Sequence, residues 1–88
     1  MYQRVITLTF KDELSKEAIT NYLQPVIKEQ GEAYGLIAMT CARINELSVV
    51  DTYYWPDYDN FEKAKNEYAG KFVEATRKAG AKVDIKEA

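Results

Sequence analysis

The chain has 88 residues, with 12 Lys and Arg against 14 Asp and Glu, and its formal net charge is −2 at pH 7. This length allows one domain, and the acidic balance without a basic block weighs against nucleic acid or an anionic membrane as a partner. Histidine is absent and cysteine occurs once, which excludes the usual zinc, haem and Ser-His-Asp sites. We therefore expect no metal and no other cofactor.

The single cysteine also indicates a compartment. Cys41 cannot form an internal disulfide, which fits a reducing, cytoplasmic environment. The sequence from Met1 onward has no apolar run long enough for a signal peptide or a membrane span. We therefore expect a cytoplasmic protein that does not bind membranes.

The first half of the chain predicts a strand, a helix and a second strand. Residues 2–10 alternate with period two, which is typical of a strand. Residues 15–31 carry apolar side chains at helical spacing, with Ser15 as the expected N-cap and Pro25 as the expected site of a kink. Residues 36–42 predict the second strand.

The second half predicts a strand, a helix and a final strand. Residues 47–55 form the third strand, and the short connection before it indicates a hairpin with the second. Pro56 ends that strand, and Asp-Asn-Phe-Glu at 59–62 is typical of a capping box that opens a second helix. Gly80 suits the C-terminal cap of this helix. Residues 82–86 alternate charged and apolar side chains, as an edge strand does.

This order of elements predicts the fold. A β-α-β-β-α-β chain with right-handed crossovers forms the α+β ferredoxin-like split fold. We expect one domain over residues 1–88, with a four-stranded antiparallel sheet and both helices on one face.

The pairing of the hairpin decides which side chains face the helices. A turn of even length pairs even positions of the second strand with odd positions of the third, which places Cys41 on the helix side. The opposite, open face then holds Val5, Thr7, Leu36, Ala38, Thr40, Val49, Asp51, Tyr53 and Trp55. Such a face exceeds the few hundred Å² of apolar surface that monomers usually expose. We therefore expect a homodimer packed sheet against sheet, with a cavity around the polar members of this face.

The segment 49–61, Val-Val-Asp-Thr-Tyr-Tyr-Trp-Pro-Asp-Tyr-Asp-Asn-Phe, combines a strand ending in Trp55, a short polar turn and Phe61 six positions later. With the element order, this segment resembles the dimeric α+β barrel superfamily, and within it the antibiotic-biosynthesis-monooxygenase-like group. The resemblance implies a barrel made by two chains, with a small-molecule pocket. Some members of the group oxidise aromatic polyketides without metal or flavin. Haem-degrading members use a histidine, which this chain lacks.

Five residues are candidates for the site. Asp51 is the candidate catalytic base, because a buried carboxylate has a raised pKa; some cofactor-free members carry an asparagine in its place. The alternative is a structural carboxylate, hydrogen-bonded to Thr40, to Tyr53 or to a group of the partner chain across the dimer. Trp55 and Tyr53 are candidate substrate-binding residues that stack on a small aromatic ligand, or else anchors of the dimer interface. Thr40 and Thr7 complete the predicted substrate contacts.

The function itself stays open between two hypotheses. One is a cofactor-independent monooxygenase or related oxidoreductase, and the other is a non-catalytic ligand-binding or structural homodimer. An RNA-recognition domain has the same element order. However, the first strand offers Val5 and Thr7 instead of an aromatic, and the net charge is negative where RNA binding needs a basic surface.

Two other residues have simpler interpretations. Arg43 could hold an anion but fits a solvated turn better. Cys41 is expected to be a small core residue.

Overall fold

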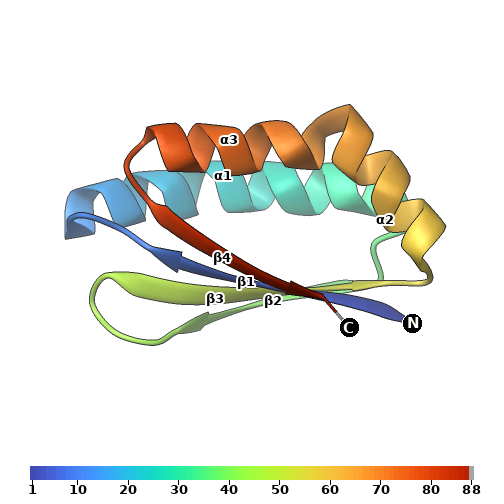
Figure 1. Ribbon diagram of the computed structural model, residues 1–88, viewed down its shortest axis with the longest axis horizontal. Coiled ribbons are helices and arrows are strands. Elements are labelled where there is room, and N and C mark those ends of the chain that lie inside the picture. Colours follow the sequence, from blue (N-terminus) through green and yellow to red (C-terminus); the bar gives the residue numbers. More distant parts are fainter. Residues whose placement is uncertain (88) are drawn as a thin grey trace.

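The protein is described from a computed structural model, which covers residues 1–87 except for the side chains at positions 23, 24, 68 and 69. Its elements are β1 (Tyr2–Thr9), α1 (Glu13–Ala33), β2 (Ala38–Arg43), β3 (Ser48–Trp55), α2 (Tyr58–Ala64), a π-helical turn η1 (Lys65–Ala69), α3 (Gly70–Lys78) and β4 (Lys82–Glu87). The strands form one antiparallel sheet in the order β2-β3-β1-β4. The helices lie over one face of this sheet (Figure 1). The predicted ferredoxin-like fold is thus confirmed.

Both helices that follow a strand begin at an aspartate. The Asp12 carboxylate accepts a hydrogen bond from the Ser15 amide at 2.7 Å, and this bond holds the pKa of Asp12 below its usual range. The Asp57 carboxylate accepts from the Asn60 amide at 2.8 Å. The predicted caps, Ser15 and the box at 59–62, were therefore placed a few residues too late, because an aspartate in extended conformation satisfies the free amides of the first turn.

The turn between β2 and β3 sets the register of the hairpin. The Ile44 amide donates to the Ser48 carbonyl at 3.0 Å, so the turn closes over an odd number of residues, 45–47. Cys41 consequently lies opposite Asp51, and residues of equal parity pair throughout. The predicted even-to-odd pairing is wrong, and a shift of one residue moves every side chain of a strand to the other face.

The corrected register places Asp51, Tyr53 and Trp55 on the face that the helices cover. Their exposed fractions are 3%, 7% and 3%. The Trp55 ring lies 6.1 Å from that of Phe61 in α2, centroid to centroid. Leu36, also predicted for the open face, is buried in the same core. These residues therefore form the interior of a single chain and not the surface of a dimer.

Cys41 is also placed differently from its prediction. It is exposed, although its register puts it on the helix side. The reason is the position of β2 at the edge of the sheet, where five of its six residues are exposed. Met39 on the same strand packs against the larger core cluster, whereas Cys41 stays exposed.

The core consists of two clusters on the helix side of the sheet. The larger cluster contains Leu36, Tyr53, Trp55, Phe61 and Ala64. The smaller one contains Phe10, Val49 and Ala81. Tyr2 pairs with Trp55 at one end of the β1–β3 ladder, and Leu8 pairs with Val49 toward the other. The middle of this ladder, where Ile6 lies opposite Asp51, therefore separates the two clusters.

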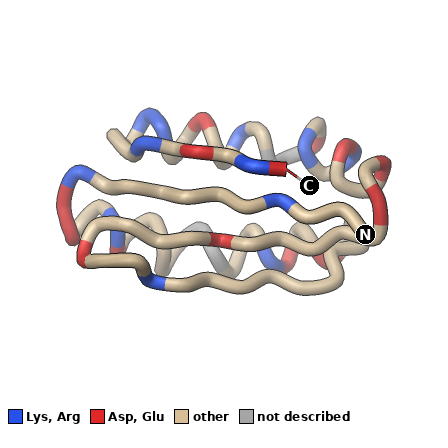
Figure 2. Tube along the Cα trace, turned by 60° about the horizontal axis from the view of Figure 1, so that its bottom comes forward, with Lys and Arg blue, Asp and Glu red and all other residues tan. Residues whose placement is uncertain are grey.

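The open face of the sheet carries no charged residue on its three strands β1, β2 and β3. Its members, read from the register, are Gln3, Val5, Thr7 and Thr9, then Ala38, Thr40 and Ala42, then Ser48, Val50, Thr52 and Tyr54. Charged positions on this face come from β4, in Lys82, Asp84 and Lys86. Figure 2 shows the long uncharged stretches of these strands. Among the described residues, no helix has the length and apolar composition needed to cross a membrane.

Candidate functional site

A partly open cavity of about 70 Å³ lies between the sheet and the helices. Most of its wall is aliphatic or aromatic, contributed by β1, β3 and β4 below and by the helices above. The polar side chains of the wall are Arg4, Thr20, Asp51, Tyr53 and Thr76. A few polar groups that converge in an apolar cavity are typical of a small-molecule site.

Asp51 and Tyr53 enter the cavity from one strand. They are two positions apart on β3, so their side chains point to the same face. The Tyr53 hydroxyl donates to Oδ2 of Asp51 at 3.5 Å, which is long for such a bond. Of the partners predicted for Asp51, Tyr53 is confirmed by this hydrogen bond. Thr40 is not available to it, because Thr40 pairs with Thr52 on the opposite face.

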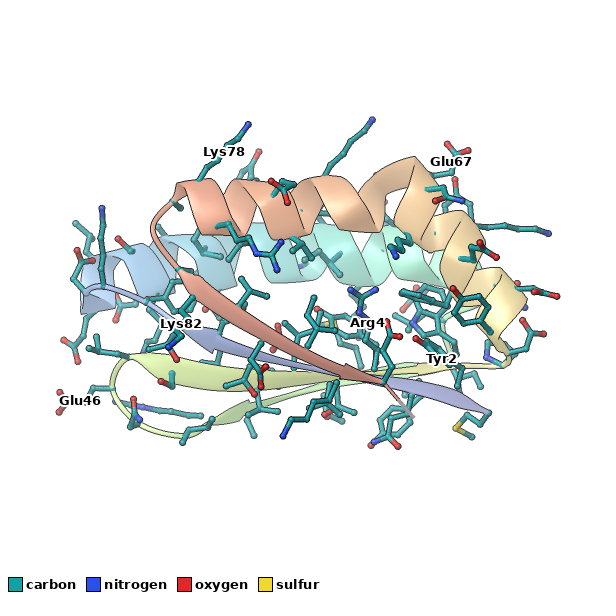
Figure 3. The ribbon with its side chains drawn as sticks, in the orientation of Figure 1. Tyr2, Arg4, Glu46, Glu67, Lys78 and Lys82 are labelled. Atoms are coloured by element: carbon teal, nitrogen blue, oxygen red, sulfur yellow. The ribbon has the colours of Figure 1, made fainter. Side chains whose placement is uncertain are left out.

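Arg4 brings a buried positive charge to the same cavity. Its exposed fraction is 7%, and its guanidinium carbon lies 4.6 Å from the ring centroid of Phe61. Nε of Arg4 is 3.9 Å from the carboxylate of Glu87. Burial lowers the pKa of Arg4, and the Glu87 charge opposes this shift. An arginine remains protonated in proteins, so the cavity contains a cation (Figure 3).

Trp55 and Phe61 are aromatic parts of the cavity wall, and the rings of Tyr2 and Tyr58 pack against Phe61. The Tyr2 ring lies 4.9 Å from that of Phe61 and 5.3 Å from that of Tyr58, between centroids. Burial, with a contribution from Glu87, raises the pKa of Tyr2 to about 12, so its hydroxyl stays neutral. Within the part of the chain that is described, the buried Nε1 of Trp55 has no hydrogen-bond partner. The aromatic part of the wall therefore offers flat apolar surface.

The structure brings together three of the five predicted site residues. Asp51, Tyr53 and Trp55 line the cavity. Thr7 and Thr40 lie on the open face and cannot line it, because they pair with Val50 and Thr52, which alternate with the cavity-facing residues of β3. Their predicted place beside Asp51 was a consequence of the wrong hairpin register.

Arg4 is a site residue that the sequence prediction missed. The available signal was its position in β1, where it shares a face with Ile6 and Leu8. A charged residue within the apolar set of a strand indicates a buried charge. Arg43, the arginine that was considered, is exposed, and its Nε donates to the Asn45 carbonyl at 3.4 Å within the turn.

The fold and the cavity define a ferredoxin-like α+β domain with a cavity of about 70 Å³ between its two layers. Three solved structures share this fold over nearly the whole length of the chain. A dimeric ferredoxin-like protein from an uncultured marine organism is 13% identical, with a TM-score of 0.75 over 100% of this chain and 92% of the other. SnoaB, a cofactor-independent oxygenase from Streptomyces nogalater, is 17% identical, with a TM-score of 0.74 over 99% and 89%.

The third is a monooxygenase from the gene ActVA-Orf6 of Streptomyces coelicolor, solved with the ligand nanaomycin D. It is 12% identical, with a TM-score of 0.70 over 99% of this chain and 86% of the other. No family model and no curated protein sequence matches the chain. At these identities the likeness concerns the fold. The resemblance to antibiotic-biosynthesis-monooxygenase-like proteins, expected from the segment 49–61, is confirmed at that level.

Proposed function

We propose that the protein binds a small aromatic molecule in the cavity between sheet and helices, and that it acts there as a cofactor-independent oxygenase. The observation that carries this proposal is the joint burial of Asp51 and Arg4 in a cavity walled by Trp55 and Phe61. Burying a charged side chain in a small core costs free energy unless the charge is well paired. Two such side chains in one cavity therefore support a functional role. The fold shared with two oxygenases supports the reaction class.

Asp51 is the proposed base. It would accept a proton from an acidic phenol, or from the ring CH₂ of an anthrone, and Tyr53 would orient its carboxylate. The resulting substrate anion gives its electrons to dioxygen, which is the oxidant. For an anthrone the balance is one substrate and one O₂ to one anthraquinone and one water, and for a quinol it is one substrate and one O₂ to one quinone and one hydrogen peroxide. Trp55 and Phe61 would pack against the ring.

The volume of the cavity indicates which of the proposed substrates should bind more readily. Its volume of about 70 Å³ is smaller than the roughly 150 Å³ of an engineered protein cavity that binds benzene. A single ring therefore enters only if the wall moves or if part of the ligand stays outside. We accordingly expect small quinols to bind more readily than the multi-ring anthrones.

The first experiment measures oxygen uptake with a panel of quinols and anthrones. Trp55 is the only tryptophan of the chain and lines the cavity, so its fluorescence reports binding in the same samples. We expect quenching and uptake for some members of the panel. Quenching without uptake would favour the non-catalytic ligand-binding alternative. Neither signal across the panel would contradict the proposed site.

We also propose a homodimer through the open face of the sheet. The face is uncharged over β1, β2 and β3, and two of the structures with this fold are dimeric ferredoxin-like proteins. Light scattering at micromolar concentration should therefore give twice the mass of the chain. Val50→Lys should yield a folded monomer, because two charges would meet across the interface.

The control for this variant is Lys86→Glu, at a position on β4 that already carries charge. It should leave the dimer intact. A monomer of the unchanged protein at these concentrations would contradict the proposal. Trp55 fluorescence does not test it, since Trp55 is buried within each chain.

A further inference from the structure

Arg4 is more deeply buried than its own contacts explain. Its side chain is 9% exposed, and its ion pair with Glu87 joins atoms 3.9 Å apart, at the outer limit of such a contact. The Glu87 side chain is 45% exposed, so solvent screens the pair. Among the described side chains, the buried Nε of Arg4 has no hydrogen-bond partner. Phe61 and Glu87 thus offset only part of the cost of burying the guanidinium, and its Nε donor is left unused.

The surroundings of Arg4 fit a ligand anion. Arg4 lies opposite Tyr53 in the β1–β3 register, and Asp51 is two residues from Tyr53 on the same face. Diagonal neighbours of this kind are within reach of a long side chain. Phe61 covers the flat side of the guanidinium, which leaves the edge, with its fork of N–H donors, for an oxygen anion.

We propose that Arg4 makes the cavity selective for aromatic ligands that carry an oxygen anion, a carboxylate or an ionised hydroxyl group, with that oxygen held by the guanidinium. This inference deepens the proposed function and rests on the same cavity as the ligand site. Arg4 would also stabilise the negative charge that the proposed reaction creates on the substrate. When Asp51 takes a proton, the negative charge moves to a substrate oxygen, and a fixed cation beside that oxygen stabilises it.

The test compares two ligands of nearly the same shape, the anionic 4-hydroxybenzoate and the neutral 4-hydroxybenzamide. Binding is followed by Trp55 fluorescence and by calorimetry, without any need for turnover. The unchanged protein should bind the carboxylate about ten- to hundredfold more tightly, as expected for a hydrogen bond to a buried charge. Arg4→Met should abolish the preference, and Arg4→Lys should keep part of it, because lysine keeps the charge but not the fork.

Two further variants sharpen the comparison. Glu87→Gln removes the competing carboxylate at 3.9 Å, so it should tighten carboxylate binding. Arg77→Met makes the same chemical change at an exposed position on α3, where Arg77 pairs with Glu74, and should change nothing. A thermal melt of each variant shows that it is folded. Arg4→Met also replaces a buried charge by an apolar side chain, which proteins often tolerate.

The outcomes separate this inference from the oxygenase proposal. A carboxylate preference that disappears in Arg4→Met supports the inference even if no compound causes oxygen uptake. Oxygen uptake with neutral quinols, together with equal binding of the two benzoate analogues, overturns the inference and leaves the oxygenase proposal standing. Failure of both analogues to bind at millimolar concentration overturns the inference too.

Discussion

Asp51→Asn is expected to lower the rate of oxygen uptake by about 10²–10⁴-fold, the usual contribution of a positioned general base. The substitution keeps the shape of a side chain that is 3% exposed, but an amide does not accept a proton at neutral pH. The fold should remain intact. Oxygen uptake and denaturant unfolding on the same preparations measure the two effects separately.

The structural hypothesis for Asp51 makes the opposite prediction. If the carboxylate only anchors the Tyr53 hydroxyl, the asparagine variant should lose about 1–3 kcal/mol of stability and show no specific loss of rate. Tyr53→Phe is the matched control, because it removes the donor at 3.5 Å and leaves the base. An Asp51→Asn protein with normal turnover would remove Asp51 from the proposed mechanism.

The raised pKa predicted for Asp51 stays a prediction. Two physical effects compete in the cavity: desolvation favours the neutral carboxyl, and the hydrogen bond donated by the Tyr53 hydroxyl favours the carboxylate. The sequence prediction considered only the first of them. The pH dependence of oxygen uptake reports which effect is larger.

The fold could be predicted because its signals are long and local. Period-two alternation runs through residues 2–10 and 47–55, and both became strands. The handedness of the crossovers then leaves few topologies for this order of elements. The ends of the helices were less predictable. Asp12 and Ser15 are both good caps, and the choice between them depends on backbone conformation.

The faces of the sheet could not be predicted in the same way, because they depend on a single turn. A turn of four residues after Ala42 and a turn of three after Ile44 fit the same alternating strands, and they give opposite pairings. The structure has the second, in which the Asn45 side chain accepts a hydrogen bond from the Leu47 amide at 2.9 Å. Asparagine commonly closes a turn in this manner, so Asn45 was the available signal.

The site residues that were predicted correctly despite the wrong register are those whose placement does not depend on strand pairing. Asp51, Tyr53 and Trp55 alternate within one strand, so they share a face in any register. Thr7 and Thr40 were added through strand pairing and lie on the other face. The same correction brings in Arg4 from β1. Predictions within one strand were therefore robust, and predictions between strands were not.

Phe61→Ala is expected to destabilise the protein by about 3–5 kcal/mol, as is typical when a buried aromatic is truncated. Phe61 is 2% exposed and lies in the larger core cluster. Its ring contacts those of Trp55 and Tyr2, and the guanidinium of Arg4 lies over it. Truncation therefore opens a void and uncovers a buried charge. Small domains are stable by about 5–15 kcal/mol, so denaturant unfolding should show a large shift in midpoint.

Tyr58→Ala is the matched control, since Tyr58 comes from the same helix and the same group of rings but is 48% exposed. Its truncation removes only half-buried apolar surface and should lower the stability by about 1 kcal/mol. Phe61→Leu, which keeps most of the buried volume, should fall between the two. If the unfolding midpoints of the two alanine variants coincided, Phe61 would not be the centre of this core, and the wall that it gives to the cavity beside Arg4 would have to be reassigned.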